Sequence, residues 1–232
     1  MEQYTVLYFG TWGYGKAGLQ GLLKSENVII KEVFTKWNPG NKNMYMDQVR
    51  ILAEENNIPV FNTLKERCSA EQFTRAVVKH NHIDFIVSCC YDRIFKPEIL
   101  SLPDRMAINV HPSLLPKYRG IKPLENAIVN GEKETGVTLH ELEKDLDSGK
   151  IIHQIGEIKI KKTNTYQKLY AKQCKAITLV LSEFFKKPEF YLANRKPQNK
   201  KQVSWAPRLS FEIRDDDTVK EIQQNSEKND VF

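Results

Sequence analysis

The sequence predicts an α/β protein with a Rossmann-like, mostly parallel sheet and flanking helices. Short apolar runs alternate with amphipathic segments of about ten residues along the first half of the chain, which is typical of βαβ units. The composition agrees, because 41% hydrophobic and 28% charged residues in a chain of 232 suit an ordinary globular core.

The elements follow in order from these patterns. The first apolar run ends in glycine at Gly10, and the later runs are rich in valine, isoleucine and phenylalanine. We expect strands at 4–9, 28–34, 59–61, 83–88 and 106–109, with helices at 15–24, 46–56 and 70–80 between them. After Gly131 the pattern changes to β-rich segments at 135–141 and 150–160, followed by a long amphipathic helix at 166–186.

Parallel sheets of this kind bind ligands beyond the carboxyl ends of their strands. We therefore expect the site to lie just after Phe9, Phe34, Ser88 and Ile108.

A change in composition divides the chain near residue 187. Residues 1–187 are expected to form the catalytic domain, and residues 188–232 a linker with a small C-terminal appendage. Residues 187–202 are polar and contain two prolines, which indicates an irregular linker. A hairpin-like piece and a last helix are expected between Val203 and Gln224, and residues 226–232 are expected to fray.

The composition also indicates where the protein works. No apolar run approaches the ~18 residues of a membrane span, and the first residues lack the features of a signal peptide, so we expect a cytoplasmic protein without membrane contact. The four cysteines (Cys68, Cys89, Cys90 and Cys174) have no zinc or redox spacing, so no metal is expected. The adjacent Cys89 and Cys90 are read as small core residues.

The charge is unevenly distributed. The net charge is +6, yet the residues from Leu209 onward hold seven acids against three bases, which leaves +10 for residues 1–208. A basic body suggests an anionic partner, such as phosphate groups, polyglutamate or nucleic acid, although lysines on a solvated surface are an alternative. Because no arginine-rich run is interleaved with aromatic residues, a nucleic-acid partner is not favoured.

A glycine motif, Gly13-Tyr-Gly-Lys-Ala-Gly18, matches the dinucleotide fingerprint G-x-G-x-x-G after the first strand. Two features oppose that function. Two residues separate the strand from the motif, and Lys36 stands near the end of the second strand where an NAD site needs an acid. Lys36 could bind the 2′-phosphate of NADP, so an NADP site remains an alternative. The glycines are better explained in another way: they let backbone amides approach a different ligand, or they let the helix pack closely against its neighbours.

The residues with the clearest chemistry are Asn109, His111 and Asp147. Asn109 and His111 alternate along a strand, so they share one face, and the strand ends at Pro112. Asp147 lies in a glycine turn about thirty residues later. A histidine can accept the proton of an attacking amine, an amide N–H can stabilise an oxyanion, and a carboxylate can orient the imidazole. This set suits acyl transfer to an amine. Ser113 is a rival nucleophile, but it lacks the G-x-S-x-G elbow of a hydrolase.

These residues also resemble a known family. The motifs N-x-H-P-S-L-L-P-x-x-R-G, G-E-x-x-T-G-V-T and L-D-S-G, between Asn109 and Ile152, resemble the folate-dependent formyltransferases. The resemblance implies a formyltransferase fold, 10-formyltetrahydrofolate as formyl donor, no metal, and Asn109, His111 and Asp147 as catalytic residues. It also implies that the segment 88–94 lies beside the pterin and that the loop 114–120 edges the cleft. The cofactor-binding candidates are Ser88, Tyr91, Arg93 and Ile94, and the substrate-binding candidates are Trp12, Tyr118, Arg119 and His140.

The resemblance to the sugar N-formyltransferases implies that the amine belongs to a nucleotide-linked amino sugar, with dTDP as the expected nucleotide, for surface polysaccharide such as the O-antigen of lipopolysaccharide. The chain resembles the sugar N-formyltransferases because it is shorter than methionyl-tRNA formyltransferases and has Thr11-Trp-Gly-Tyr-Gly15 instead of the phosphate loop of glycinamide ribonucleotide enzymes. Those two activities remain alternatives, as does a binding module that no longer catalyses. A homodimer is a further possibility, with the tail serving dimerisation.

Overall fold

The fold is built on one mostly parallel sheet. The computed structural model describes residues 2–38, 44–64 and 67–229, and in these residues seven strands form a sheet in the order β3-β2-β1-β4-β5-β7-β8. The strands are β1 (Tyr4–Gly10), β2 (Val28–Thr35), β3 (Val60–Asn62), β4 (Phe85–Cys89), β5 (Met106–His111), β7 (Glu134–Glu141) and β8 (Ile151–Lys159). The first five are parallel to one another, while β7 is antiparallel to both β5 and β8. The predicted α/β class is confirmed.

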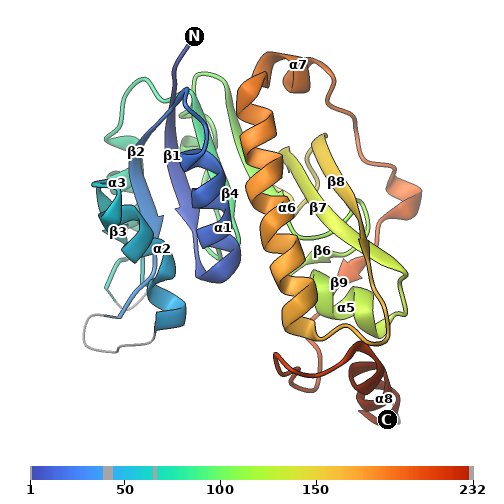
Figure 1. Ribbon diagram of the computed structural model, residues 1–232. Helices are drawn as coiled ribbons and strands as arrows, with labels where there is room; N and C mark the ends of the chain where they lie inside the picture. Colours follow the sequence, from blue (N-terminus) through green and yellow to red (C-terminus); the bar gives the residue numbers. More distant parts are fainter. Residues whose placement is uncertain (1, 39–43, 65–66, 230–232) are drawn as a thin grey trace.

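Helices cover both faces of the sheet. On one face lie α1 (Trp12–Leu23), α2 (Met44–Glu55) and α6 (Tyr166–Lys186), whose apolar side chains join the larger core cluster with Val6, Val87 and Val110 of the strands. On the other face α3 (Ala70–Val78) and α4 (Pro97–Leu100) enclose a smaller cluster that includes Phe9 and Phe34. Figure 1 shows α1 and α6 side by side in front of the sheet.

The long helix α6 forms where the sequence predicts it. Its first turn is capped by Thr165, whose hydroxyl accepts a hydrogen bond from the amide of Lys168 at 3.2 Å. The buried positions repeat at helical spacing, so one stripe of the helix faces the sheet. They are Leu169, Gln173, Ala176, Ile177, Val180, Leu181, Phe184 and Phe185.

The glycines of α1 allow close packing. A Cβ added at Gly18 would lie 2.4 Å from the hydroxyl of Tyr8 in β1, and one at Gly21 would lie 2.8 Å from the carbonyl oxygen of Thr178 in α6. Neither neighbour leaves room for a side chain. Gly13 and Gly15 are also crowded, by Tyr170 and by the backbone of Gly10. The glycine motif is therefore explained by contacts between elements, as its alternative interpretation proposed.

The C-terminal part differs from the expected linker and hairpin. Residues 188–193 form α7 (Pro188–Ala193), because proline is well suited to the first turn of a helix. After a 3-10 turn, η1 (Lys200–Gln202), the strand β9 (Trp205–Ala206) pairs in parallel with β6 (Arg119–Gly120), so no hairpin forms. The last helix, α8 (Val219–Asn229), continues beyond the residue where fraying was expected, and it packs against α5 (Pro123–Val129). The domain boundary at residue 187 stays a prediction.

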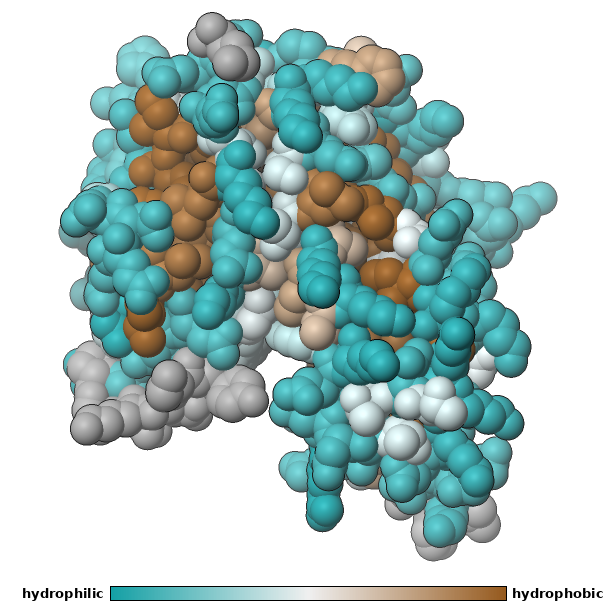
Figure 2. Space-filling view, in the orientation of Figure 1, coloured by the Kyte–Doolittle hydropathy of each residue, from teal (hydrophilic) through white to brown (hydrophobic). Residues whose placement is uncertain are grey.

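The surface seen from this side is mixed. Figure 2 shows apolar residues gathered over β2, while the end of the molecule around α8 is mostly hydrophilic. Within the described residues, no helix is both long and apolar enough to cross a membrane.

Candidate active site

Three neighbouring strands, β4, β5 and β7, bring the central polar side chains together. Asn109 and His111 lie at the end of β5, on the same face of the strand as expected. Asn109 pairs in register with Ser88 of β4 on one side and with His140 of β7 on the other. Because these strands form adjacent ladders, three polar side chains meet at the edge where the parallel strands end.

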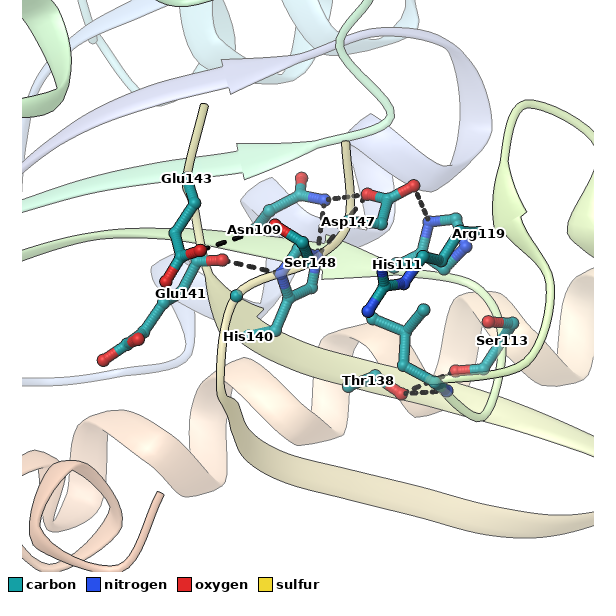
Figure 3. A network of polar contacts seen from close by, with 12 residues as sticks. Asn109, His111, Ser113, Arg119, Thr138, His140, Glu141, Glu143, Asp147 and Ser148 are labelled. Carbon is teal, nitrogen blue, oxygen red and sulfur yellow. Dashed lines mark hydrogen bonds and ion pairs between the residues drawn. The ribbon is translucent and has the colours of Figure 1, made fainter. Parts of the chain in front are cut away.

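Asp147 enters this group from the loop that follows β7. Its Oδ2 atom lies 3.6 Å from Nδ1 of His111 and accepts a hydrogen bond of 2.9 Å from the backbone N–H of Gly120. Its Oδ1 atom lies 3.6 Å from Nε2 of His140 and 3.5 Å from the amide nitrogen of Asn109. Figure 3 shows these four side chains pointing toward one another. The predicted grouping of Asn109, His111 and Asp147 is thus present in the structure.

The backbone of Asp147 is in an uncommon conformation. Its φ is +50°, in the left-handed region that non-glycine residues rarely adopt. The side chain is buried beside two imidazole rings, although an aspartate is usually exposed. Strained backbone at a buried carboxylate is common at functional sites, where surrounding contacts hold it in place.

The hydrogen bonds assign the protons of both histidines. Nε2 of His111 lies 2.7 Å from the carbonyl oxygen of Tyr118, and Nδ1 of His140 lies 2.7 Å from the carbonyl oxygen of Glu141. A carbonyl oxygen only accepts, so each of these nitrogens carries a hydrogen. In the neutral ring of His111 the lone pair is therefore on Nδ1, which faces Asp147.

The same reasoning fixes the orientation of Asn109. Nε2 of His140 presents a lone pair, so the group 3.1 Å away must be the NH2 of Asn109 and not its oxygen. Burial lowers the pKa of His140 to about 4, against a smaller opposing effect from Asp147, so this ring is neutral at pH 7. One N–H of Asn109 is held by His140, while the other faces Asp147 at 3.5 Å, the limit of a hydrogen bond.

The loop after β5 is held by side chains of β7 and β8. The hydroxyl of Thr138 donates to the carbonyl of Ser113 at 2.7 Å and accepts from the amide of Leu115 at 3.1 Å. Gln154 donates to the carbonyl of Leu115 and to the Thr138 hydroxyl, each at 2.8 Å. The Ser113 hydroxyl donates to the carbonyl of Lys117 within the same loop and is buried, which assigns it a structural role and not that of a nucleophile.

The four cofactor-binding candidates have different surroundings. Ser88 is buried beside Asn109, and the side chain of Ile94 is 88% exposed in the loop after β4. The ring of Tyr91 packs against the smaller core cluster, and burial raises the pKa of its hydroxyl. The guanidinium of Arg93 donates to the carbonyls of Thr63 at 3.0 Å and of Cys68 at 2.6 Å. The side chains of Tyr91 and Arg93 thus brace this loop, and their cofactor-binding role stays a prediction.

The substrate-binding candidates also divide. Trp12 begins α1 with φ +54° and is 40% exposed at the edge where the strands end. Tyr118 contacts His111 through its backbone carbonyl, while the hydroxyl of its buried side chain donates a hydrogen bond to Glu132. Arg119 is bound to Gln198, and His140 contacts Asn109 directly. Of these four, His140 belongs to the central polar group.

Lys36 and Cys89 are both buried near the ends of strands of the parallel sheet, β2 and β4. Lys36, the residue considered for the 2′-phosphate of NADP, is buried and forms an ion pair with Asp92. Cys89 is buried, and burial raises the pKa of its thiol, which agrees with a core residue. Among the described residues, no cluster of three or more histidine, cysteine or acidic side chains is arranged to hold a metal ion.

Sequence reasoning missed two contributors to the site. Gly120 binds Asp147 through its backbone, which a side-chain pattern does not reveal. Gln198 donates to the carbonyls of Asp147 and Gly149, but it lies in a polar, proline-containing stretch that resembled a linker. A single glutamine in such a stretch gives no signal of its own.

The sheet and the buried acid–base group define an α/β protein with a site suited to group transfer at its sheet edge. The chain belongs to the formyl transferase family, because the model of the Formyl transferase domain matches residues 22–183. It is 33% identical to a methionyl-tRNA formyltransferase of Pseudothermotoga lettingae over 207 residues, which cover 88% of this chain and 65% of that relative. It is also 33% identical to a methionyl-tRNA formyltransferase of Clostridioides difficile, over 94% of this chain and 70% of that relative. The chain thus spans about two thirds of the length of these relatives.

Solved structures share the fold. The glycinamide ribonucleotide transformylase 1 of Symbiobacterium toebii matches with a TM-score of 0.69 and 16% identity, over 85% of this chain and 95% of that one. The N-formyltransferase of Helicobacter canadensis, in complex with folinic acid and dTDP-3-aminofucose, matches with a TM-score of 0.67 and 24% identity, over 100% of this chain and 81% of that one. The formyltransferase fold expected from the sequence is therefore confirmed.

Proposed function

We propose that the protein transfers a formyl group from 10-formyltetrahydrofolate to a primary amine. The observation that carries this proposal is the convergence of Asn109, His111 and Asp147, within 3.6 Å contacts, in a member of the formyl transferase family. The donor supplies a formyl group that an amine can attack. The side chains supply proton transfer and charge stabilisation, which is the chemistry that this attack needs.

Each side chain has a role that follows from its contacts. Nδ1 of His111 accepts a proton from the amine, since Nε2 is already committed to the carbonyl of Tyr118. The carboxylate of Asp147, 3.6 Å from Nδ1, stabilises the resulting imidazolium. The imidazolium would then return the proton to the folate nitrogen as the bond from that nitrogen to the formyl carbon breaks, which releases tetrahydrofolate. The weakly held N–H of Asn109 turns from Asp147 toward the formyl oxygen, where negative charge develops as the amine attacks.

The folate is proposed to bind along the loop after β4. Ser88 ends up beside Asn109, and the exposed side chain of Ile94 offers apolar surface to a flat ring. Backbone groups of the segment 88–94 would then bind the polar edge of the pterin, since the side chains of Tyr91 and Arg93 are engaged elsewhere.

A hollow between α5 and the segment 208–213 offers room for a nucleotide-linked amino sugar as the amine substrate. It has a volume of about 560 Å³, in the range of small-molecule pockets, and it is lined by Lys122, Tyr166, Arg208 and Phe211 together with neighbouring residues. The wall holds two cations, Lys122 and Arg208, and two carboxylates, Glu125 and Glu212, so its side-chain charges balance. Lys122 pairs with Glu125 at 2.9 Å. The support for a nucleotide comes from the rings of Tyr166 and Phe211, which offer faces on which a base would stack. The dTDP-3-aminofucose in the Helicobacter canadensis complex belongs to this substrate class.

Methionyl-tRNA is the second candidate. It is supported by the curated relatives named above, which are methionyl-tRNA formyltransferases at 33% identity. A glycinamide ribonucleotide substrate is a third possibility, supported by the Symbiobacterium toebii structure.

The test is an assay with 10-formyltetrahydrofolate and a panel of amines, comprising dTDP-linked amino sugars, the free amino sugars, methionyl-tRNA and glycinamide ribonucleotide. We expect a mass gain of about 28 Da (one CO) on a nucleotide-linked amino sugar, with far slower reaction of the free sugar because the remote nucleotide helps to position the amine. His111→Asn and Asp147→Asn should fold, as judged by circular dichroism, and lose at least about 100-fold in kcat. Transfer to methionyl-tRNA alone would leave the reaction in place and replace the substrate; full activity of His111→Asn would refute the proposed roles.

A further inference from the structure

The segment after α7 crosses the molecule and contacts both loops that surround Asp147. Its residue Gln198 is half-buried and uses its whole hydrogen-bonding capacity. Its amide nitrogen donates to the carbonyls of Asp147 at 2.7 Å and Gly149 at 2.8 Å. Its oxygen accepts from Nε of Arg119 at 3.2 Å and from a terminal nitrogen of Arg119 at 2.7 Å.

The same segment then binds the second loop through its backbone. The amide of Arg119 donates to the carbonyl of Ser204 at 2.9 Å, and the amide of Ile121 donates to that of Ala206 at 3.3 Å. Between them lies Gly120, whose own amide donates to the carboxylate of Asp147. The loop 114–121 thus binds the carboxylate of Asp147 through Gly120, and the loop 142–150 contains its backbone. Residues 198–206 contact both loops and so connect them.

Asp147 is held from outside its own turn as well as from within it. Within the turn, the carbonyl of Asp145 accepts from the amide of Ser148 at 3.4 Å and from its hydroxyl at 2.9 Å, and Asp147 itself is at φ +50°. A residue in this region of backbone space persists where its surroundings hold it. The two short bonds from Gln198 fall on the carbonyls of Asp147 and Gly149, on either side of Ser148.

We propose that Gln198 is a positioning residue, which holds Asp147 at its distance from His111 by fixing the loop backbone and joining it to Arg119. This inference rests on the proposed role of Asp147 in formyl transfer. A displacement of about 1 Å in a catalytic group costs on the order of 100-fold in rate, so loss of this hold should be visible in kcat.

Two substitutions separate the two halves of the contact. Gln198→Ala removes all four hydrogen bonds. Gln198→Glu keeps acceptors for Arg119 but replaces the donor by a carboxylate that faces the carbonyls of Asp147 and Gly149. Gln202→Ala is the matched control, because Gln202 is an exposed glutamine in the same segment.

The first measurement is hydrogen exchange in the full chain, which does not depend on knowing the substrate. In Gln198→Ala and Gln198→Glu, exchange should rise in peptides covering 118–121 and 142–150, while Gln202→Ala should match the wild type. Unchanged exchange in both Gln198 variants would overturn the proposal. If the exchange rises as expected but the wild-type protein formylates no amine, the proposed function fails and the structural hold remains.

The second measurement is steady-state kinetics with the accepted amine. Both Gln198 variants should lose about 10- to 100-fold in kcat, with KM for folate and amine changed less than about threefold. In an Asp147→Asn background, adding Gln198→Ala should cost less than about threefold, because residues that act through one another are not additive. Equal losses in both backgrounds, or wild-type kcat in Gln198→Glu, would show that Gln198 does not act through Asp147.

Discussion

At the scale of single residues, His140 links the backbone carbonyl of Glu141 to the side-chain amide of Asn109. Its Nδ1–H is bound to the carbonyl of Glu141, and its Nε2 accepts from Asn109 at 3.1 Å. Because burial lowers its pKa to about 4, the ring stays neutral at neutral pH and keeps the lone pair that orients the Asn109 amide.

His140 should therefore make stability depend on pH. In the unfolded chain a histidine titrates near pH 6.5, but in the folded protein His140 titrates at about 4. Its contribution is complete above pH 6.5 and is lost as the pH falls toward 4, by roughly 3 kcal/mol in total. Urea unfolding at pH 7, 5.5 and 4.5 should show a smaller loss in His140→Gln, which keeps an acceptor for Asn109 but does not titrate. An identical pH dependence in both proteins would contradict this account.

The sequence revealed the side chains of the site better than its backbone. Asn109 and His111 were placed on one face of a strand from their i, i+2 spacing, and the structure shows them there. The carbonyl of Tyr118 and the amide of Gly120 depend on loop conformation, which spacing along a strand does not encode. Gln198 contacts Asp147 across 51 residues of sequence, so only the folded chain brings them together.

At the scale of elements, the seam between α1 and α6 sets the spacing of the helical layer. Gly21 lies against the backbone of Thr178, and the hydroxyl of Thr178 donates to the carbonyl of Ala17 in α1 at 2.9 Å. A small residue at this position lets the two helices approach, so the seam should not accept a larger one.

Gly21→Ala should consequently destabilise the protein, although alanine favours helices more than glycine does. The added Cβ would lie 2.8 Å from a backbone oxygen, and overpacking of this kind costs about 1–3 kcal/mol. Gln20→Ala, at an exposed position of the same helix, should change the free energy of unfolding by less than about 0.5 kcal/mol. Chemical denaturation with a common m-value compares the two, and a more stable Gly21→Ala protein would show that the helices can separate without cost.

Elements were predicted best where the sequence has a clear apolar pattern. The strands of the parallel sheet, which are apolar runs, and α6, which has a long helical repeat, agree with the predicted ranges to within a few residues. The short helices α5 and α7 and the two-residue strands β6 and β9 have too few residues for a period to appear. The pairing of β6 with β9 joins residues 86 positions apart and is set by tertiary contacts alone.

At the scale of the whole molecule, the salt dependence of binding distinguishes the candidate substrates. The net charge of +6 would attract both a nucleotide and a transfer RNA. The two differ in the number of phosphates that the protein must neutralise, which determines how strongly binding depends on salt.

For a nucleotide-linked sugar we expect KM to change by less than about tenfold between 50 and 200 mM salt, since only two phosphates are involved. Six to ten phosphate contacts with RNA would lower affinity by about 10³- to 10⁵-fold over the same interval. Initial rates at 50, 100 and 200 mM potassium chloride, with free 10-formyltetrahydrofolate saturating, measure this slope. A steep slope with methionyl-tRNA as the accepted substrate would favour the second candidate.

The parallel pair β6–β9 also has a consequence for the order in which the protein is made. Asn109, His111 and Asp147 are all synthesised well before Gln198, Ser204 and Ala206, which bind the loops around Asp147. A growing chain that already contains the three polar side chains, with the bonds from Tyr118, Gly120 and His140, still lacks the bonds from Gln198 and from residues 204–206 to the loops around Asp147. The loops around Asp147 therefore acquire their full set of hydrogen bonds only after residue 206 has been added to the growing chain.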